Sequence, residues 1–163
     1  MFELLASSGL RPFRLKGRDL LPVVQGGMGV GVSAHRLAGS VAALGALGTI
    51  ASVDLRHHHP DLMARSKGVR ERAVLDAINR EALDREIRQA KSLAQGRGAV
   101  AVNVMKAVDD NPNLVRQACE SGADAIVMGA GLPFDLPDMV ADFPEVALVP
   151  ILSDSRGVTV VLK

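Results

Sequence analysis

Four glycines occur within six residues, from Gly26 to Gly31, directly after a short apolar run. A glycine-rich backbone turns sharply and lets a planar ligand approach closely, because no Cβ atom stands in the way. We therefore expect this loop to bind a ligand. The segment from Gly29 to Ala34 also matches the G-x-G-x-x-A dinucleotide fingerprint, and Asp54 follows twenty residues after Ala34. That fingerprint begins four residues beyond Gln25, whereas a Rossmann turn has its first glycine at the strand's end, so this interpretation is the weaker one.

Polar or glycine residues stand at the end of each of five short apolar runs: Gln25, Ser52 with Asp54, Asn103, Gly129 and Ser153. In parallel α/β folds, ligands bind at the carboxyl ends of the strands. Asn103 is the sharpest case, because an amide in the otherwise apolar run AVAVNVM must find hydrogen-bond partners. It either bonds the neighbouring loop or reaches a polar ligand, and the residues alone leave both open.

Histidine and cysteine offer weaker candidates. His57, His58 and His59 are consecutive, so they cannot all face one metal from a regular backbone, and no second His or Cys cluster completes a tetrahedral shell. We expect this loop to flank the mouth of the site, with at most one imidazole near the ligand. Cys119, the single cysteine, lies among apolar neighbours with no adjacent cation, which indicates packing rather than a nucleophile.

The elements that must position these residues are buried parallel strands, which the five apolar runs predict. The runs are Leu21–Gln25, Gly48–Ser52, Ala99–Val104, Ala125–Met128 and Val146–Leu152. Outside residues 56–98, successive runs begin roughly two dozen residues apart, which is typical of repeated βα units and predicts a parallel sheet.

Helical patterns lie between the runs. The first helix is predicted to begin with Ser33 as its N-cap and to end at Gly45. It carries Ala34, Leu37, Val41 and Leu44 at helical spacing. A later helix opens with Asn111-Pro112 and ends at Gly122, with an inward stripe of Val115, Ala118 and Cys119.

Residues 56–98 interrupt this pattern and are predicted to be a helical insertion: an irregular loop followed by one long surface helix. Its second half is amphipathic, and Glu81 with Arg85 and Asp84 with Arg88 form favourable i,i+4 pairs. A solvated charged face is the simplest explanation.

Composition excludes several classes of function. The chain has 163 residues, 48% of them hydrophobic, and a formal net charge of +1, so one globular domain is expected and no electrostatic case for nucleic acid exists. It has no Trp and no Tyr, which removes most of the aromatic faces that stack on single-stranded bases. The N-terminus lacks an apolar stretch long enough for a signal peptide or membrane span, so we expect a cytoplasmic protein without membrane contact.

Four segments of the chain resemble the flavin-dependent nitronate monooxygenases, formerly called 2-nitropropane dioxygenases. They are LPVVQGGMGVGVSAHRLAGSVAALGALGTIAS (residues 21–52), VAVNVM (100–105), GADAIVMGAGLP (122–133) and VPILSDSRG (149–157). The order and spacing of these segments cover most of the chain after residue 20, and their combination is specific although each piece alone is weak.

The resemblance implies a (β/α)8 TIM barrel that holds FMN at its carboxyl face, with about five βα units in residues 1–163. It implies that the loop of Gln25, Gly26, Gly27 and Met28 lies against the flavin, with Met28 as a backbone contact beside the ring. It also implies that Asn103 hydrogen-bonds the cofactor and that Gly129, Gly131 and Ser153 line the same cavity. The expected reaction is oxidation of an alkyl nitronate, or of a nitroalkane after proton removal, by molecular oxygen to a carbonyl compound and nitrite.

A barrel of this type needs about 250 residues, so the sequence predicts an incomplete barrel. The family's catalytic histidine, in an Ala-Gly-Gly-His type motif, and the phosphate-binding glycine loops are expected beyond Lys163, so no residue here is assigned a catalytic role. We expect such a piece to aggregate, form a homo-oligomer or need its C-terminal half. A flavin-dependent enoyl-thioester reductase is the alternative enzyme, and a non-catalytic half-barrel that serves as an interaction module is the alternative from another class.

Overall fold

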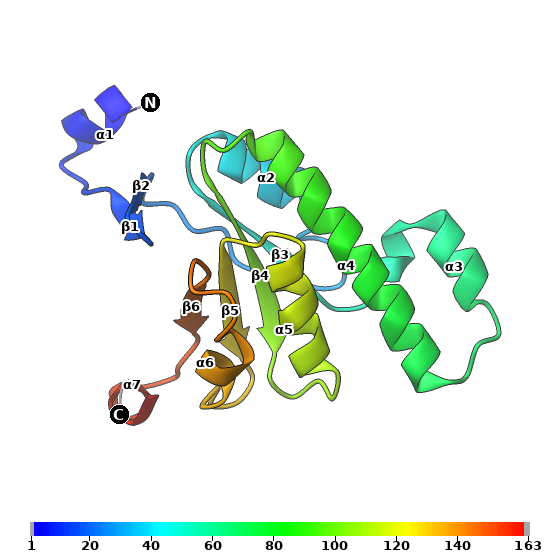
Figure 1. The fold of residues 1–163 in the computed structure, drawn as a ribbon. Helices are drawn as coiled ribbons and strands as arrows, with labels where there is room; N and C mark the ends of the chain where they lie inside the picture. Colours follow the sequence, from blue (N-terminus) through cyan, green and yellow to red (C-terminus); the bar gives the residue numbers. More distant parts are fainter. Residues whose placement is uncertain (1, 162–163) are drawn as a thin grey trace.

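The computed structural model describes residues 2–161 and contains a four-stranded parallel sheet with helices packed against it (Figure 1). The helices are α1 (Phe2–Ser8), α2 (His35–Ala43), the 3-10 turn η1 (Leu55–His58), α3 (Pro60–Ser66), α4 (Arg72–Ala94), α5 (Asn111–Glu120), α6 (Leu136–Met139) and α7 (Ser155–Val161). The strands are β1 (Phe13–Leu15), β2 (Arg18–Leu20), β3 (Leu47–Ala51), β4 (Ala99–Met105), β5 (Ala125–Gly129) and β6 (Ala147–Pro150).

The sheet has the order β3-β4-β5-β6, the same as the order along the chain, and all its strands are parallel. Right-handed crossovers between strands in this order place the connecting helices on one face. Figure 1 shows α2, α4 and α5 together on one side of the sheet. A doubly wound sheet instead reverses its strand order and carries helices on both faces. The α/β class predicted from the sequence is thus confirmed.

The two faces of the sheet carry different side chains. The face covered by helices has large branched side chains, among them Ile50, Val100, Val102 and Ile126, which pack with α2, α4 and α5. The opposite face is built in register rows of smaller side chains. One row contains Thr49, Ala101, Ala125 and Ala147, and the next contains Ala51, Asn103, Val127 and Val149.

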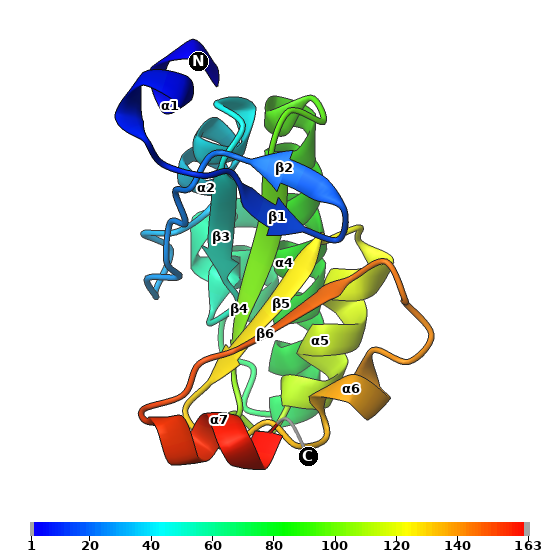
Figure 2. The same ribbon diagram turned by 90° about the vertical axis from the view of Figure 1, so that its left-hand side faces the viewer.

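The antiparallel hairpin β1–β2 was not predicted from the sequence. Its turn residues Lys16 and Gly17 both have positive φ, as a two-residue type I′ turn requires. Leu15 and Leu20 pack on the amino ends of the sheet strands, and Figure 2 shows the hairpin lying across that end of the face without helices. Strands of three residues carry too little periodicity to be recognised in a sequence.

The prediction of a strand over Leu21–Gln25 is wrong, because the chain forms only an isolated parallel bridge there, from Val24 to Leu47. Leu47 N donates to Val23 O and Gln25 N donates to Leu47 O, which completes one rung. The next rung is made by a side chain: Thr49 N donates to Gln25 Oε1 at 2.9 Å. The Gln25 carboxamide therefore replaces the backbone that a regular strand would supply.

Helix α2 differs from its prediction in two ways. It begins at His35 with Ala34 as N-cap, and no side chain of its own caps it, so Ser33 is not the N-cap. Its buried face is Ala38, Gly39 and Ala42 rather than the predicted stripe, and Leu44 is 58% exposed. In α5 the prediction is confirmed, because Val115, Ala118 and Cys119 are all buried.

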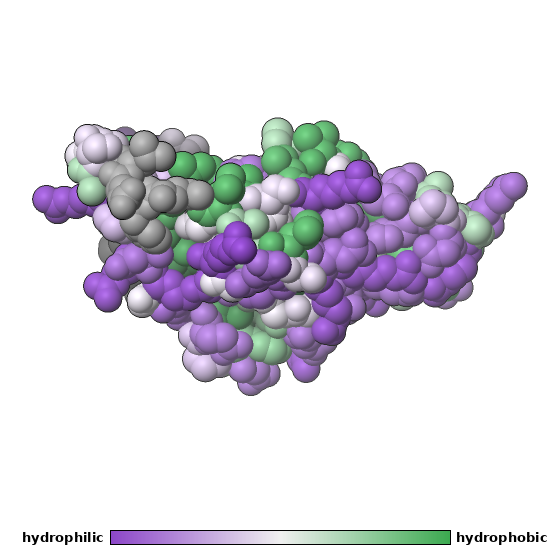
Figure 3. Space-filling model, turned by 90° about the horizontal axis from the view of Figure 1, so that it is seen from above, coloured by the Kyte–Doolittle hydropathy of each residue, from purple (hydrophilic) through white to green (hydrophobic). Residues whose placement is uncertain are grey.

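The insertion at residues 56–98 contains more helix than predicted. The expected irregular loop holds η1 and α3, and the expected long helix is α4. The ion pairs Arg85–Glu81 and Arg88–Asp84 both form along α4. Seen from above, hydrophilic side chains dominate the half of the surface that carries α3 and α4 (Figure 3). The charged face is thus solvated, as expected.

Within residues 2–161, none of the helices is both long enough and apolar enough to cross a lipid bilayer.

Candidate functional site

The carboxyl edge of the parallel sheet collects the residues that the sequence singled out. In the strand register, Asn103 lies between Ala51 and Val127, and Met105 pairs with Gly129. The loop after Gln25 joins this edge beside β3, and the segment after β6 joins it beside β5, where Ile151 N donates to Met128 O. The predicted residues therefore share one edge, although they come from four separate segments of the chain.

Gln25 holds the glycine loop onto the sheet. Besides accepting from Thr49 N, its carboxamide donates from Nε2 to Thr49 O at 3.2 Å, to Ser33 Oγ at 2.9 Å and to Gly26 O. Both ends of the carboxamide are thus engaged within the protein. Gln25 orients the backbone that follows it, so its contribution to a ligand site is positional.

Ser33 is a site residue that sequence reasoning missed. It is fully buried, and its hydroxyl accepts from Met28 N at 2.9 Å and donates to Gly26 O at 3.1 Å. Its main chain also bonds Met28 O and Ala51 N. A serine just before a helix suits a cap equally well, so the sequence carried no signal for this loop-fastening role.

Met28 uses both of its main-chain polar groups inside the loop, because its N–H bonds Ser33 Oγ and its carbonyl accepts from Ser33 N. What it offers a ligand is its side chain, which is 45% exposed. The expected contact beside a flavin ring would therefore be made by packing, without a main-chain hydrogen bond.

Asn103 combines the two roles that the sequence left open. Its Nδ2 donates to Val127 O at 3.2 Å, so one N–H serves the neighbouring strand. Its Oδ1 accepts no hydrogen bond from the described residues and remains available as an acceptor. A Cβ added to Gly27 would lie 2.6 Å from the Asn103 Cβ, which shows how closely the glycine loop packs on this side chain. Only glycine permits that approach.

Gly131 and Ser153 line one hollow of about 390 Å³ with Leu132 and Ile151, and Gly129 lies beside it, since a Cβ there would be 3.0 Å from Ile151 Cβ. The Lys106 side chain packs on Gly131, where its Cγ would lie 3.1 Å from an added Cβ. The Lys106 ammonium hydrogen-bonds Asp135 at 2.5 Å and holds the pKa of that carboxyl below its usual value. This half of the edge therefore has a fixed charge pair next to an apolar hollow.

Asp54, the acidic residue of the dinucleotide fingerprint, is engaged elsewhere. It bonds Arg56 and Asn79, the latter at 3.3 Å from Nδ2. Burial raises the pKa of Asp54, but these hydrogen bonds and the charge of Arg56 outweigh that effect and leave the pKa lowered. Together with the unreversed strand order, this engagement argues against dinucleotide binding.

The three consecutive histidines point to different places. His57 and His58 are exposed, and the His58 ring fills the space in which a Cβ of Gly31 would lie. His59 Nε2 is 3.0 Å from the buried carboxylate of Glu86. Across residues 2–161, no three His, Cys, Asp or Glu side chains are grouped so that they could hold a metal ion.

Cys119 is buried, and burial followed by the charges of Glu145 and Glu120 raises the pKa of its thiol to about 11. At neutral pH it is a protonated thiol within the packing of α5. The interpretation of this residue as core is confirmed.

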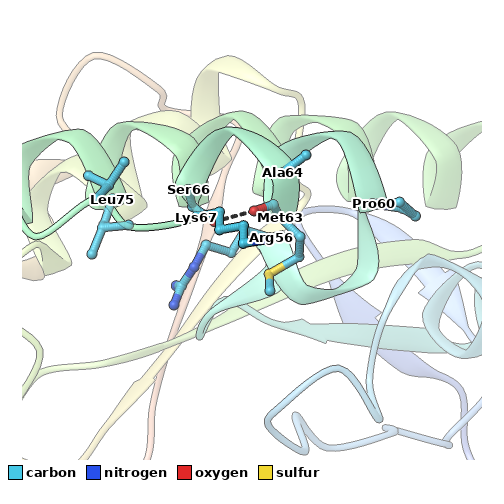
Figure 4. Close-up of a pocket in the computed structure, with 8 residues that line it drawn as sticks. Arg56, Pro60, Met63, Ala64, Ser66, Lys67 and Leu75 are labelled. Carbon is cyan, nitrogen blue, oxygen red and sulfur yellow. Dashed lines mark hydrogen bonds between the residues drawn. The ribbon is translucent and has the colours of Figure 1, made fainter.

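A hollow of about 650 Å³ between α3 and the start of α4 is separate from the sheet edge (Figure 4). Met63 and Leu75 give it apolar walls, and its Arg56 is bonded to Asp54 and Asn79. None of the predicted site residues lines it. The sheet edge therefore remains the better candidate.

No family model matches the chain, and no curated protein matches it either.

Proposed function

We propose that this chain is the FMN-binding part of a nitronate monooxygenase-like enzyme, which oxidises alkyl nitronates with molecular oxygen to a carbonyl compound and nitrite. The observation that carries the proposal is the contact between Gly27 and Asn103, which brings the glycine loop and the strand asparagine into one place at the carboxyl edge.

The arrangement of the sheet supports the proposal that these residues form part of a (β/α)8 barrel. In such a barrel, strands follow chain order, helices cover the outside, and inward side chains form layers. Residues 2–161 have this strand order, helices on one face, and register rows of small side chains on the other. These features favour a barrel over a doubly wound sheet.

The residues at the edge fit a planar, polar-rimmed cofactor. Gly26 has open space where a Cβ would stand, so a ring can approach the backbone there. Asn103 keeps an unpaired oxygen beside it, which can accept from an N–H on the rim of an isoalloxazine. The exposed side chains of Met28 and Met105 provide apolar surface for the face of the ring.

When bound, FMN supplies the electron transfer and the reaction with oxygen. The protein's residues then have the task of orientation. The Asn103 side chain would fix the orientation of the ring within its own plane. Gln25 and Ser33 hold the glycine loop in a position that leaves space for the ring. Preorganised dipoles of this kind avoid reorganisation during the reaction.

The test is flavin uptake followed by anaerobic reduction. The protein is incubated with excess FMN and freed of unbound flavin, and its visible spectrum is recorded. We expect a bound flavin that propyl-2-nitronate bleaches in the absence of oxygen. Bleaching by reduced pyridine nucleotide alone would favour an enoyl-thioester reductase instead. A protein that is folded by circular dichroism yet takes up no FMN would overturn the proposal and favour the interaction module.

A further inference from the structure

A buried carboxylate lies between two imidazoles on the helical side of the sheet. Glu86 of α4 is 1% exposed. Its Oε2 accepts from the main-chain N–H of His35 at 2.6 Å and lies 2.7 Å from His35 Nδ1. Its Oε1 lies 3.0 Å from His59 Nε2. The flavin site proposed above uses none of these groups.

The position of Glu86 has a structural reason. The N-cap of α2 is Ala34, which has no side chain able to bond the free N–H groups of the first turn. Glu86 reaches across from α4 and bonds the N–H of His35, so it caps α2 from another helix. The positive end of the helix dipole stabilises a negative charge there. A carboxylate buried for this purpose can also orient an imidazole.

This contact fixes the orientation of His35. With Nδ1 facing Glu86, the proton of the neutral ring is on Nδ1 and the lone pair is on Nε2. His35 Nε2 makes no hydrogen bond to the part of the chain that the structure describes. The His35 ring lines a pocket of about 440 Å³ between α2, η1 and α4, together with the apolar Val32 and Leu37 and the hydrogen-bond donors Arg36 and Gln89.

We propose that this pocket is a second, catalytic site, in which His35 oriented by Glu86 acts as a nucleophile toward small acyl compounds such as carboxylic esters. A carboxylate that holds Nδ1–H keeps the basic nitrogen aimed outward and stabilises the imidazolium that forms. The inference does not rest on the proposed flavin chemistry.

The reaction balances without a further reagent. His35 Nε2 attacks the carbonyl carbon and forms an N–C bond, and the ester C–O bond breaks as the alkoxide leaves with the electron pair. Glu86 faces the positive charge of the acyl-imidazolium through Nδ1–H. Water then cleaves the N–C bond, which releases the carboxylic acid and restores the neutral imidazole, while a proton passes to the alkoxide.

The experiment measures hydrolysis of 4-nitrophenyl acetate by the full chain near neutral pH. We expect hydrolysis faster than that by free imidazole at equal concentration. His35→Gln should reduce the rate to background, and Glu86→Gln should lower it by at least about tenfold, because the imidazole loses its charged partner. His57→Gln is the matched control, since His57 is exposed and outside the pocket, and it should keep the full rate.

A second measurement needs no variant. Diethyl pyrocarbonate acylates neutral imidazoles, and mass spectrometry locates the modified histidine. We expect His35 to react at least as fast as the exposed His57. Protection of His35 from the reagent, or an esterase rate that His35→Gln leaves unchanged, would overturn the proposal and leave Glu86 as a helix cap alone.

Discussion

Single carboxamides organise the edge of this sheet, and each does so differently. Both the oxygen and the nitrogen of the Gln25 carboxamide are hydrogen-bonded within the protein. Asn103 instead donates one N–H to Val127 O, and its oxygen is free to accept a hydrogen bond from a ligand. The first residue therefore has a mainly structural role, and the second can recognise a ligand. A substitution at each position should separate stability from binding.

Asn103→Leu tests the binding role. It removes the carboxamide at nearly constant volume, and a hydrogen bond to a charged or buried polar group is worth roughly 1.5 to 3 kcal/mol. We expect FMN affinity to fall by about one to two orders of magnitude, measured by quenching of flavin fluorescence. Asn113→Leu, on the exposed surface of α5, is the control and should bind like the wild type. Equal affinity of both variants would return Asn103 to a purely structural role.

Asp54 makes the folding stability of the molecule depend on pH in the acid range. Because its folded-state pKa lies below the usual 3.8, its ionised form stabilises the fold above that value, and the stabilisation is lost as pH falls through the folded pKa. We expect Asp54→Asn to be less stable than wild type at neutral pH, with the difference shrinking below about pH 4. Urea denaturation at several pH values measures this. A difference that stays constant down to pH 2 would contradict it.

At the scale of elements, the glycine loop and strand β4 fit together at one contact. Gly26 and Gly27 are neighbours in the sequence, yet only Gly27 packs on Asn103, and Gly26 faces open space. The loop's position is thus fixed by the second glycine, and the first is left for a ligand.

Two alanine substitutions compare these glycines directly. Gly27→Ala would place a Cβ 2.6 Å from the Asn103 Cβ, and crowding of this kind typically costs about 1 to 3 kcal/mol of unfolding free energy. Gly26→Ala meets nothing within 4 Å and should leave the stability of the ligand-free protein unchanged. Thermal or chemical denaturation of both variants measures the difference. Equal stabilities would mean that the loop moves away from β4 without cost.

The same elements show what the sequence could predict. Strands β3, β4 and β5 were predictable because most of their side chains are buried, which leaves near-continuous apolar runs such as AVAVNVM. The segment 21–25 is equally apolar, but the Gln25 side chain, and not the backbone, accepts the hydrogen bond from Thr49 N. Hydrophobic periodicity gives no sign of such a substitution. The site residues at strand ends were predictable from topology. The Ser33 hydroxyl instead acts through contacts inside its own loop, and Glu86 acts through a contact with a distant segment, and neither leaves a pattern in the sequence.

At the scale of the whole molecule, the sheet is open at β6. Within the described residues, β6 pairs with β5 alone, and apolar side chains are exposed on it and beside it, including Leu148, Ile151 and Leu132. Unpaired edges with apolar neighbours favour association with other strands. We therefore expect this side to govern how copies of the chain associate.

Leu148→Lys places a charge on that edge strand and should reduce self-association, as seen by sedimentation velocity over a range of concentrations. Leu44→Lys, at a more exposed apolar residue at the end of α2, is the control and should associate like the wild type. If both variants behave alike, association does not involve β6.

The rung made by Gln25 also has a consequence for local opening. Thr49 N–H is protected by a side chain, whereas Ser52 N–H is protected by Asn103 O in the neighbouring strand. In deuterated solvent, both amides should exchange slowly in the wild type. In Gln25→Ala we expect the Thr49 amide to exchange quickly while the Ser52 amide stays slow. β3 would then open locally at Thr49, on the side that faces residue 25, and would stay paired with β4.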